Sequence, residues 1–294
     1  MSTEPTRSQT EDSTGALDAD WTSACRRMVA VHRDLFAAER GIAARTVYEG
    51  RGEGGDRTLA IDRRAEDAVF AELEALHAEG HEFTAISEER GTVRFGDGRS
   101  RSRVVIDPID GSLNARRTIP SHALSLAVAS GETMGDVGFG YVYDFGAGEE
   151  FVARRGRGVT LNDEPLSAEG PGYGLEVVGI EAAKPERIVP MLLELEGKAF
   201  RIRAIGSIAI MLSYVAAGRL DGALTARACR SVDAAAAQLI AREAGAEVEF
   251  PGFEAGDAPL GLDARYHVTA ALDPELLEAL RPAQARAQPV ARSS

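Results

Sequence analysis

Two carboxylates stand close together near the middle of the chain, where Asp107 and Asp110 are separated only by Pro108 and Ile109. The preceding run Val104–Ile106 is apolar and β-branched. It predicts a buried strand that ends at Pro108, because proline cannot donate a ladder hydrogen bond. A turn after Asp110 would bring both carboxylates to one point, where they repel each other unless a cation lies between them. Mg²⁺ prefers such oxygen ligands, so this stretch predicts a divalent-cation site.

The backbone after the second carboxylate is suited to an anion. We expect a turn at Asp110-Gly111, and the N–H groups around Gly111 and Ser112 could point at an anion, as they do in turns that lead into a helix. The alternative interpretation is that the Asp, Pro and Gly residues here serve turn geometry alone.

Four more acidic residues can be explained either by a chemical role or by local structure alone. Asp62 stands where the N-cap of a helix belongs, which predicts a capping role. Glu88 and Glu89 follow a strand predicted at Phe83–Ile86, and such exposed glutamates commonly face solvent. Asp233 falls in the first turn of a predicted helix, where a carboxylate interacts favourably with the helix dipole.

Taken together, these acidic stretches resemble a known family. Residues 107–114 read DPIDGSLN, which resembles the metal-binding signature of the inositol monophosphatase family, the Mg²⁺-dependent, lithium-sensitive phosphomonoesterases. Ser87-Glu88-Glu89 resembles the family's GEE element. Val232-Asp233-Ala234-Ala235 resembles its WD-x-A element, with valine in place of tryptophan. The resemblance extends from about residue 16 to about residue 280, and the family also includes fructose-1,6-bisphosphatases and nucleotide and sugar phosphatases.

The resemblance implies a site with two or three Mg²⁺ ions and a role for each motif residue. Asp62 would accept a hydrogen bond from the Ser112 hydroxyl, and Ser112 would orient the water that attacks phosphorus in line. No covalent phosphoenzyme is expected. The implied metal ligands are Glu88, Asp107, the Ile109 carbonyl, Asp110 and Asp233; the implied catalytic residues are Asp62, Glu88 and Ser112; the implied substrate-binding residues are Asp110, Gly111, Ser112 and Ser207.

The sequence does not decide which small phosphate ester is the substrate. The implied activity is hydrolysis of a small sugar or polyol phosphate, with fructose 1,6-bisphosphate, histidinol phosphate and adenosine 3′,5′-bisphosphate as alternatives. A family member that binds sugar phosphates without turnover is a further alternative. Many inositol-specific members carry a carboxylate where this chain has Thr225 or Ala226, and the SEE variant is similar to the archaeal-type branch. Without that carboxylate, other residues must contact the leaving group, and the candidates are Ser207, Arg116 and Lys184.

Composition limits the possible partners. The chain has 294 residues and a formal net charge of −13, so we expect no binding to nucleic acid or to an anionic membrane surface. Bound cations would explain how such an acidic protein attracts a phosphate ester. Cys25 and Cys229 form no zinc or redox motif, which predicts buried thiols in the reducing cytoplasm. We expect a small phosphorylated substrate and, from the resemblance, a homodimer.

Strands and helices alternate along the chain without tandem repeats, which predicts stacked α/β layers of the α+β kind. The resemblance implies an αβαβα sandwich of the inositol monophosphatase/fructose-1,6-bisphosphatase type. We expect a disordered tail over residues 1–15, an N-terminal half carrying the metal motifs over 16–165, a C-terminal half over 166–281 and a flexible tail over 282–294. The glycine-dense segment 49–56 predicts a mobile loop beside the site.

Overall fold

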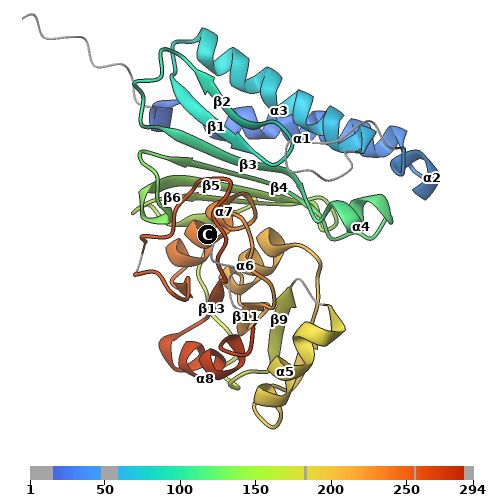
Figure 1. The fold of residues 1–294 in the computed structure, drawn as a ribbon, viewed down its shortest axis with the longest axis vertical. Coiled ribbons are helices and arrows are strands. Elements are labelled where there is room, and N and C mark those ends of the chain that lie inside the picture. The colour runs from blue at the N-terminus through green and yellow to red at the C-terminus, as the bar shows by residue number, and fades with distance from the viewer. Residues whose placement is uncertain (1–15, 48–58, 182–183, 255, 288–294) are drawn as a thin grey trace, which may run out of the picture.

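The structure of the protein is a computed structural model that describes residues 16–47, 59–181, 184–254 and 256–287. These residues form five layers, in the order helices, larger sheet, helices, smaller sheet, helices (Figure 1). The order is that of the predicted αβαβα sandwich, so the predicted fold class is confirmed. The segment 49–56 and the tail 1–15 lie outside the described residues, and the expectations for both stay predictions.

The larger sheet has the strand order β2-β1-β3-β4-β5-β6-β7-β8 within the described part of the chain. Strands β1 and β3 run parallel, and the other neighbouring pairs are antiparallel. The carboxyl ends of β1 and β3 therefore meet at one edge, where Ser87 pairs with Ile106. The strands are β1 Phe83–Ser87, β2 Gly91–Phe95, β3 Arg103–Asp110, β4 Ala123–Ala129, β5 Val137–Asp144, β6 Glu149–Arg154, β7 Val159–Leu161 and β8 Glu164–Leu166.

Strand β3 continues through Pro108, so the prediction that it ends there is wrong. Its ladder with β4 pairs Asp107 with Ser125 and next pairs Asp110 with Ala123, with a shift of register between the two pairs. The shift leaves Pro108 outside the regular ladder, and its missing N–H therefore costs no ladder hydrogen bond. Both carboxylates consequently sit on an irregular strand end and not in a loop.

Two long helices, α1 (Trp21–Ala38) and α3 (Ala60–Ala78), cover the outer face of the larger sheet (Figure 1). Trp21 is fully buried there, with its ring centroid 5.7 Å from that of Phe83 in an edge-to-face contact. Its indole N–H donates to the Ala16 carbonyl at 2.6 Å, so the polar end of the ring is also satisfied. Burial of an aromatic side chain of this size contributes roughly 3 kcal/mol to stability.

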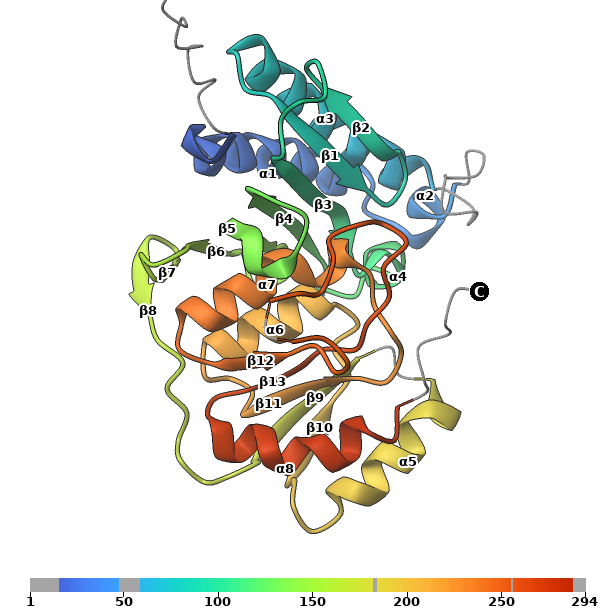
Figure 2. The same cartoon turned by 60° about the vertical axis from the view of Figure 1, so that its left-hand side comes forward.

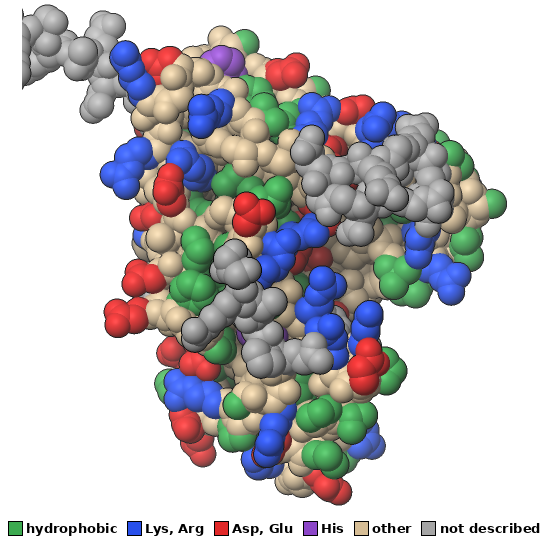
Figure 3. Space-filling view, viewed as in Figure 1, with side chains coloured by type: hydrophobic (Ala, Val, Ile, Leu, Met, Phe, Trp, Pro, Cys, Tyr) green, Lys and Arg blue, Asp and Glu red, His purple; other side chains and the backbone are tan. Residues whose placement is uncertain are grey.

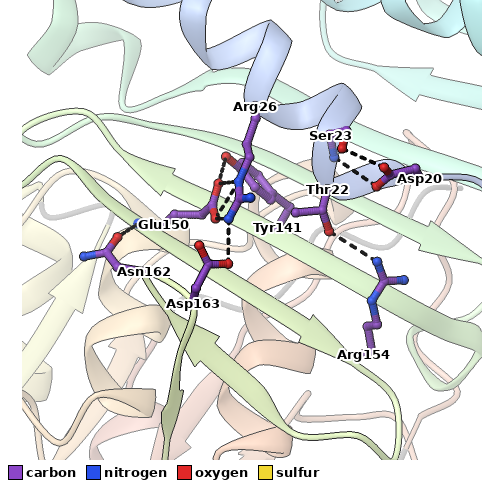
Figure 4. Close-up of polar contacts among 9 residues, drawn as sticks. All are labelled: Asp20, Thr22, Ser23, Arg26, Tyr141, Glu150, Arg154, Asn162 and Asp163. Atoms are coloured by element: carbon purple, nitrogen blue, oxygen red, sulfur yellow. Dashed lines mark hydrogen bonds and ion pairs between the residues drawn. The ribbon is translucent and has the colours of Figure 1, made fainter.

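A polar network fixes α1 against the sheet (Figure 4). Arg26 of α1 donates to Glu150 of β6 from Nη2 at 2.6 Å and from Nε at 3.0 and 3.1 Å. The hydroxyl of Tyr141 donates to the same carboxylate at 2.8 Å. Glu150 is buried, and a buried charge is tolerated only with partners of this kind. Nearby, Arg154 donates to the Thr22 hydroxyl at 3.2 Å and extends the attachment along the helix.

The smaller sheet has the strand order β10-β9-β11-β13-β12 within the described residues. Helices α6 and α7 lie between the two sheets, and α5 and α8 cover the outer face of the smaller one (Figure 2). Its elements are β9 Val177–Glu181, α5 Pro185–Leu195, β10 Arg201–Arg203, α6 Ile208–Ala216, β11 Gly222–Thr225, α7 Ser231–Glu243, β12 Glu247–Glu249, β13 Thr269–Ala271 and α8 Pro274–Gln284. The shorter helices are Ala16–Asp18, α2 Ile42–Arg45, α4 Ser112–Arg116 and Met134–Asp136.

Helix α8 runs to Gln284, so residues 282–284 of the tail predicted over 282–294 are helical. The Gln284 side chain accepts from the N–H of Thr225 at 3.3 Å and donates to its carbonyl at 3.0 Å. Ala283 is fully buried. These contacts hold the last turn in place although Pro282 cannot donate a helical hydrogen bond. The predicted division at residue 165 stays a prediction, and one hydrophobic cluster includes residues from both sides of it.

Both cysteines are free thiols and both are buried, as the sequence predicted. Among the described residues, none of the helices combines the length and the apolar character that a membrane crossing requires.

Thr118 is a strained position at the end of α4. Its φ angle of 59° lies in the left-handed region, which suits glycine and is costly for a β-branched residue. The Thr118 hydroxyl donates to the carbonyl of Arg117 at 2.7 Å. The residue is exposed to solvent.

We therefore expect Thr118→Gly to raise the free energy of unfolding by roughly 1 kcal/mol, because glycine adopts this backbone conformation without steric cost. Urea unfolding measures the change. Thr133→Gly is the matched control, because Thr133 has a φ of −124° and caps the helix Met134–Asp136, so its replacement should lower stability. A Thr118→Gly protein no more stable than the wild type would contradict the assignment of strain.

Candidate active site

Three carboxylates from three separate elements meet at the edge where β1 and β3 end. One carboxylate oxygen from each of Glu88, Asp107 and Asp233 lies within 4.8 Å of the others. We call these three residues the acidic cluster. The three residues were predicted as metal ligands from the sequence, and the structure brings them together.

Glu88 enters the cluster from the turn between β1 and β2. Ser87 and Gly91 pair across the ends of the two strands, so the turn consists of residues 88–90. Gly91 has a φ of 70°, a conformation typical of the residue that closes a short hairpin loop. Glu88 is thus the first residue after a buried strand, and its position follows that of β1.

Asp233 enters the cluster from the first turn of α7. Its Oδ2 accepts from the N–H of Arg230 at 2.8 Å, which holds the carboxylate against the start of the helix. The guanidinium of Arg230 also forms an ion pair with Glu88. Arg230 therefore contacts two members of the acidic cluster, one through its backbone and one through its side chain.

Asp107 and Asp110 use their carboxylates differently. Asp107 is buried, and its Oδ1 accepts from the N–H of Ile109 at 2.9 Å. Asp110 Oδ2 accepts from the Ser207 hydroxyl and from the N–H of Ala209, both at 2.6 Å. Asp110 is therefore fixed to the start of α6 and lies outside the acidic cluster as the described residues define it.

Gly111 connects this strand end to α4 where the backbone has little room. Its φ is 89°, and a Cβ atom there would lie 2.9 Å from the Ser121 carbonyl oxygen and 3.0 Å from that of Gly206. Only glycine fits both the conformation and the space. Asn114 then donates to the carbonyls of Ser121 and Ile205 at 2.8 and 2.7 Å, which attaches α4 to the C-terminal half.

Asp62 lies inside α3, so the prediction that it is the N-cap residue is wrong. Leu59 is the N-cap residue, and Asp62 falls in the first helical turn. One oxygen of Asp62 is buried and has no hydrogen-bond partner within the described part of the chain. The Ser112 hydroxyl donates to the Ile109 carbonyl at 2.8 Å, so the expected hydrogen bond from Ser112 to Asp62 is not formed here.

Burial and mutual repulsion raise the pKa values of four aspartates of the site. Burial, and next the charges of Asp110, Glu88 and Asp233, raise the pKa of Asp107 well above its usual value.

The neighbouring groups are shifted in the same direction. Burial, helped by the charge of Asp233, raises the pKa of Asp110 to about 8. Burial likewise raises the pKa of Asp233 to about 6, although the Arg230 N–H opposes the shift. Burial, with the charges of Glu89 and Glu88, raises the pKa of Asp62 to about 7.

A hard divalent cation fits this set of residues. All donor atoms of the acidic cluster are carboxylate oxygens, which are the ligands that Mg²⁺ prefers. The raised pKa values of Asp107 and Asp233 indicate that these two charges are under-compensated, and a cation would relieve the repulsion and keep both groups ionised. The buried oxygen of Asp62 provides a further acceptor next to the cluster.

Basic side chains surround the acidic cluster although the chain as a whole is acidic. Figure 3 shows lysine and arginine side chains gathered near the middle of the face that Figure 1 presents. The charge of Arg116 acts on Asp62, and those of Arg230 and Arg265 act on Asp233. Such a rim is favourable for an anionic ligand. The sequence analysis missed Arg230 and Arg265, because isolated arginines in an arginine-rich chain give no signal of their own.

The residues expected to set substrate choice lie in different surroundings. Thr225 and Ala226 are fully buried at the end of β11, and Thr225 accepts from the N–H of Val268 at 2.9 Å. Ser207 is buried and is held by Asp110. Lys184 is exposed at the start of α5.

Comparison with known proteins decides the family. A model described as the inositol monophosphatase family matches residues 19–286. The chain belongs to this family. As an inositol monophosphatase family member, it is a phosphoric monoester hydrolase. The resemblance found in the sequence is thereby confirmed.

Two relatives and one solved structure illustrate the match. A fructose-1,6-bisphosphatase/inositol-1-monophosphatase of Methanothermobacter thermautotrophicus is 32% identical over 242 residues, which cover 77% of this chain and 83% of that protein. The protein of the same name from Archaeoglobus fulgidus is 34% identical over 246 residues, covering 79% and 87%. The crystal structure of an inositol monophosphatase–fructose 1,6-bisphosphatase superposes with a TM-score of 0.76 at 27% identity, covering 90% of this chain and 100% of that one.

The raised pKa values predict that the metal-free protein loses stability as the pH rises. Each shifted carboxyl binds its proton more tightly in the folded state than in the unfolded chain, where its pKa is about 4. The free energy of unfolding should therefore fall from about pH 4 upwards, through the pKa values of about 6, 7 and 8 of Asp233, Asp62 and Asp110.

Urea unfolding in the presence of EDTA at pH 5 and pH 8 measures this loss, and Mg²⁺ should restore more stability at pH 8 than at pH 5. Asp110→Asn should flatten the dependence, because it removes one of the shifted groups. A stability that stays constant or rises between pH 5 and pH 8 in EDTA would contradict the electrostatic description of the site.

Proposed function

We propose that this chain is a Mg²⁺-dependent phosphomonoesterase that hydrolyses a small sugar or polyol phosphate with water as the nucleophile. The observation that carries the proposal is the acidic cluster: Glu88, Asp107 and Asp233 converge from distant parts of the chain with oxygens within 4.8 Å. A fold gains no stability from burying like charges at one point, so the arrangement is best explained by the cation it holds.

The proposed site contains two or three Mg²⁺ ions. Glu88, Asp107 and Asp233 are the proposed ligands, together with Asp110 and the Ile109 carbonyl. When bound, Mg²⁺ supplies Lewis-acid chemistry, since it acidifies water and offsets charge on the phosphoryl oxygens.

The remaining roles belong to the chain's own side chains. Asp62, with a pKa raised to about 7, is proposed to accept a proton from the attacking water near neutral pH. Ser112 is proposed to orient that water, and the packing of Ile61 and Ala65 against Ile109 and Ala115 keeps the start of α3 beside α4. Gly111 and Ser112 are proposed to donate their N–H groups to the phosphoryl oxygens.

The leaving group would lie toward α6, where Asp110 and Ser207 are joined by a hydrogen bond of 2.6 Å. These two residues are proposed to contact the alcohol part of the substrate. Arg116 and Lys184 are proposed to contribute from the rim of the site.

Fructose 1,6-bisphosphate is the second candidate substrate. The basic rim of Arg116, Arg230 and Arg265 favours a ligand with more than one anionic group. The relatives from Methanothermobacter thermautotrophicus and Archaeoglobus fulgidus carry both activities in their names, which supports the same pair of substrates here.

We further propose that the protein acts in the cytoplasm as a homodimer and binds neither nucleic acid nor membranes. The two buried free thiols are compatible with a reducing compartment. Light scattering coupled to size-exclusion chromatography measures the oligomeric state, and a monomer at micromolar concentration would contradict the dimer.

The direct test is Mg²⁺-dependent release of phosphate by the wild type and by Asp233→Asn. The substitution keeps the shape of the side chain but removes a ligand charge, so we expect a loss of activity of at least a hundredfold. Asp221→Asn is the matched control, because Asp221 is a buried carboxylate that accepts from the Val177 N–H outside the acidic cluster. Equal activity of Asp233→Asn and the wild type at saturating Mg²⁺ would contradict the proposed ligand set.

Selectivity for inositol 1-phosphate should be weak. A site built to pair with substrate hydroxyls discriminates strongly, because analogues without them leave buried polar groups unpaired. Thr225 and Ala226 provide no carboxylate for that purpose, and Thr225 is already engaged with Val268.

We therefore expect kcat/KM for inositol 1-phosphate to lie within about a hundredfold of the values for fructose 1,6-bisphosphate and glycerol 2-phosphate, about 2.7 kcal/mol of discrimination. The three esters are compared at one pH and one Mg²⁺ concentration. A larger preference for inositol 1-phosphate would show that another residue supplies the missing contact.

A further inference from the structure

The turn that carries Glu88 is held by one buried carboxylate of α3. Glu66 is only 3% exposed and accepts a hydrogen bond from the Ser87 hydroxyl. It also accepts from the backbone N–H of Arg90 at 3.1 Å. Ser87 precedes the turn and Arg90 ends it, so Glu66 contacts both ends of the segment that presents Glu88.

Arg90 reinforces the same attachment through its side chain. Its Nε lies 3.7 Å from Glu66 Oε2, and its guanidinium also pairs with Asp67. The guanidinium carbon lies 4.3 Å from the centre of the Phe70 ring, a cation–π contact. Glu66, Asp67 and Phe70 belong to one stretch of α3, so this stretch binds the turn at several points.

The same helix carries Asp62 one turn before Glu66. Residues four apart on a helix lie on the same face, so Asp62 and Glu66 point toward the same side of α3. Glu88 and Glu89 are close enough to Asp62 for their charges to act on it. Helix α3 therefore sets both the position of Asp62 and, through Glu66, the position of the turn with Glu88.

We propose that Glu66 is a positioning residue that holds the Glu88 turn in the geometry required for cation binding, through Ser87 and Arg90. The proposal rests on the proposed function, because it assumes that Glu88 is a cation ligand. Glu66 itself is not a member of the acidic cluster as the described residues define it. Its effect is exerted on Glu88 through the two ends of the turn.

Ser87 gives the contact a hydroxyl that the glycine of the family's GEE element would not supply. Its side chain is fully buried, and its hydroxyl is a donor that a glycine at the same position would lack. Replacement of Ser87 by alanine removes this donor without adding or removing a charge. It therefore tests the attachment independently of the electrostatics of the site.

The experiment measures the Mn²⁺ dissociation constant of the full chain by electron paramagnetic resonance of free Mn²⁺, with Mn²⁺ as the probe cation. Glu66→Gln should weaken Mn²⁺ binding at least tenfold, because it removes the charge that pairs with Arg90 and replaces the oxygen nearest Arg90 Nε with an NH₂ donor. Ser87→Ala should weaken it about threefold. Glu72→Gln is the matched control on the same helix, because Glu72 pairs with Arg27 of α1 at 2.8 Å and does not contact the turn.

Urea unfolding and phosphate release are measured on the same preparations. A folded Glu66→Gln protein that binds Mn²⁺ within twofold of the wild type would overturn the proposal and leave Glu66 as a residue of structural importance only. If Glu66→Gln does not fold, Ser87→Ala decides the question, and unchanged Mn²⁺ affinity in that variant overturns the proposal. A loss of affinity in Glu72→Gln equal to that in Glu66→Gln would also overturn it.

The two proposals fail in different ways. Wild-type protein that binds Mn²⁺ but releases no phosphate from any ester would contradict the proposed function, and the variants would still test the positioning role. Wild-type protein with phosphatase activity, but with unchanged affinity in both variants, would contradict the positioning role alone.

Discussion

Repulsion between carboxylates is the constraint on which the site depends. Asp107 and Asp110 are buried on one strand end, and Glu88 and Asp233 are brought next to them from other elements. Burial and the neighbouring charges raise the pKa values of Asp107 and Asp110, so the arrangement is unfavourable for an ion-free protein. The backbone structure and hydrogen-bond donors from residues outside the cluster keep these carboxylates together. A bound cation would offset the remaining repulsion.

Helix α7 shows how packing between the two sheets supplies that backbone structure. The helix begins at Ser231, and its four consecutive alanines at 234–237 are buried where the helix packs between the larger sheet and α6. On the sheet side, a Cβ atom at Gly140 would lie 2.7 Å from the carbonyl oxygen of Ala236. Small residues on both surfaces therefore allow the helix to approach the sheet closely, which places Asp233 within reach of Asp107.

Local patterns predicted stacked sheet and helix layers, because alternation of apolar residues marks strands and helical periodicity marks helices. The αβαβα order and the roles of the acidic residues were implied by the resemblance to the family. Local rules failed where tertiary contacts decide. Pro108 lies within β3 because a register shift accommodates it, and Asp62 lies inside α3 because Leu59 is the N-cap residue.

The contacts that complete the site join residues far apart in the chain, and no spacing rule reveals them. Asp110 is bonded to Ser207 and Asn114 to Ile205, pairs that are 97 and 91 residues apart. Arg230 likewise pairs with Glu88, because α7 begins at the edge of the sheet where β1 ends. The residues that could do the chemistry were therefore predictable, whereas the residues that hold them were not.

The most direct test of the account is a crystal structure with Mn²⁺ in place of Mg²⁺, using the anomalous scattering of manganese to locate the ion. The account predicts an anomalous peak between the carboxylates of Glu88, Asp107 and Asp233, each within normal coordination distance. A peak elsewhere on the molecule with none at the acidic cluster, or no peak at millimolar Mn²⁺, would contradict the assignment of the cluster as the cation site of this phosphatase.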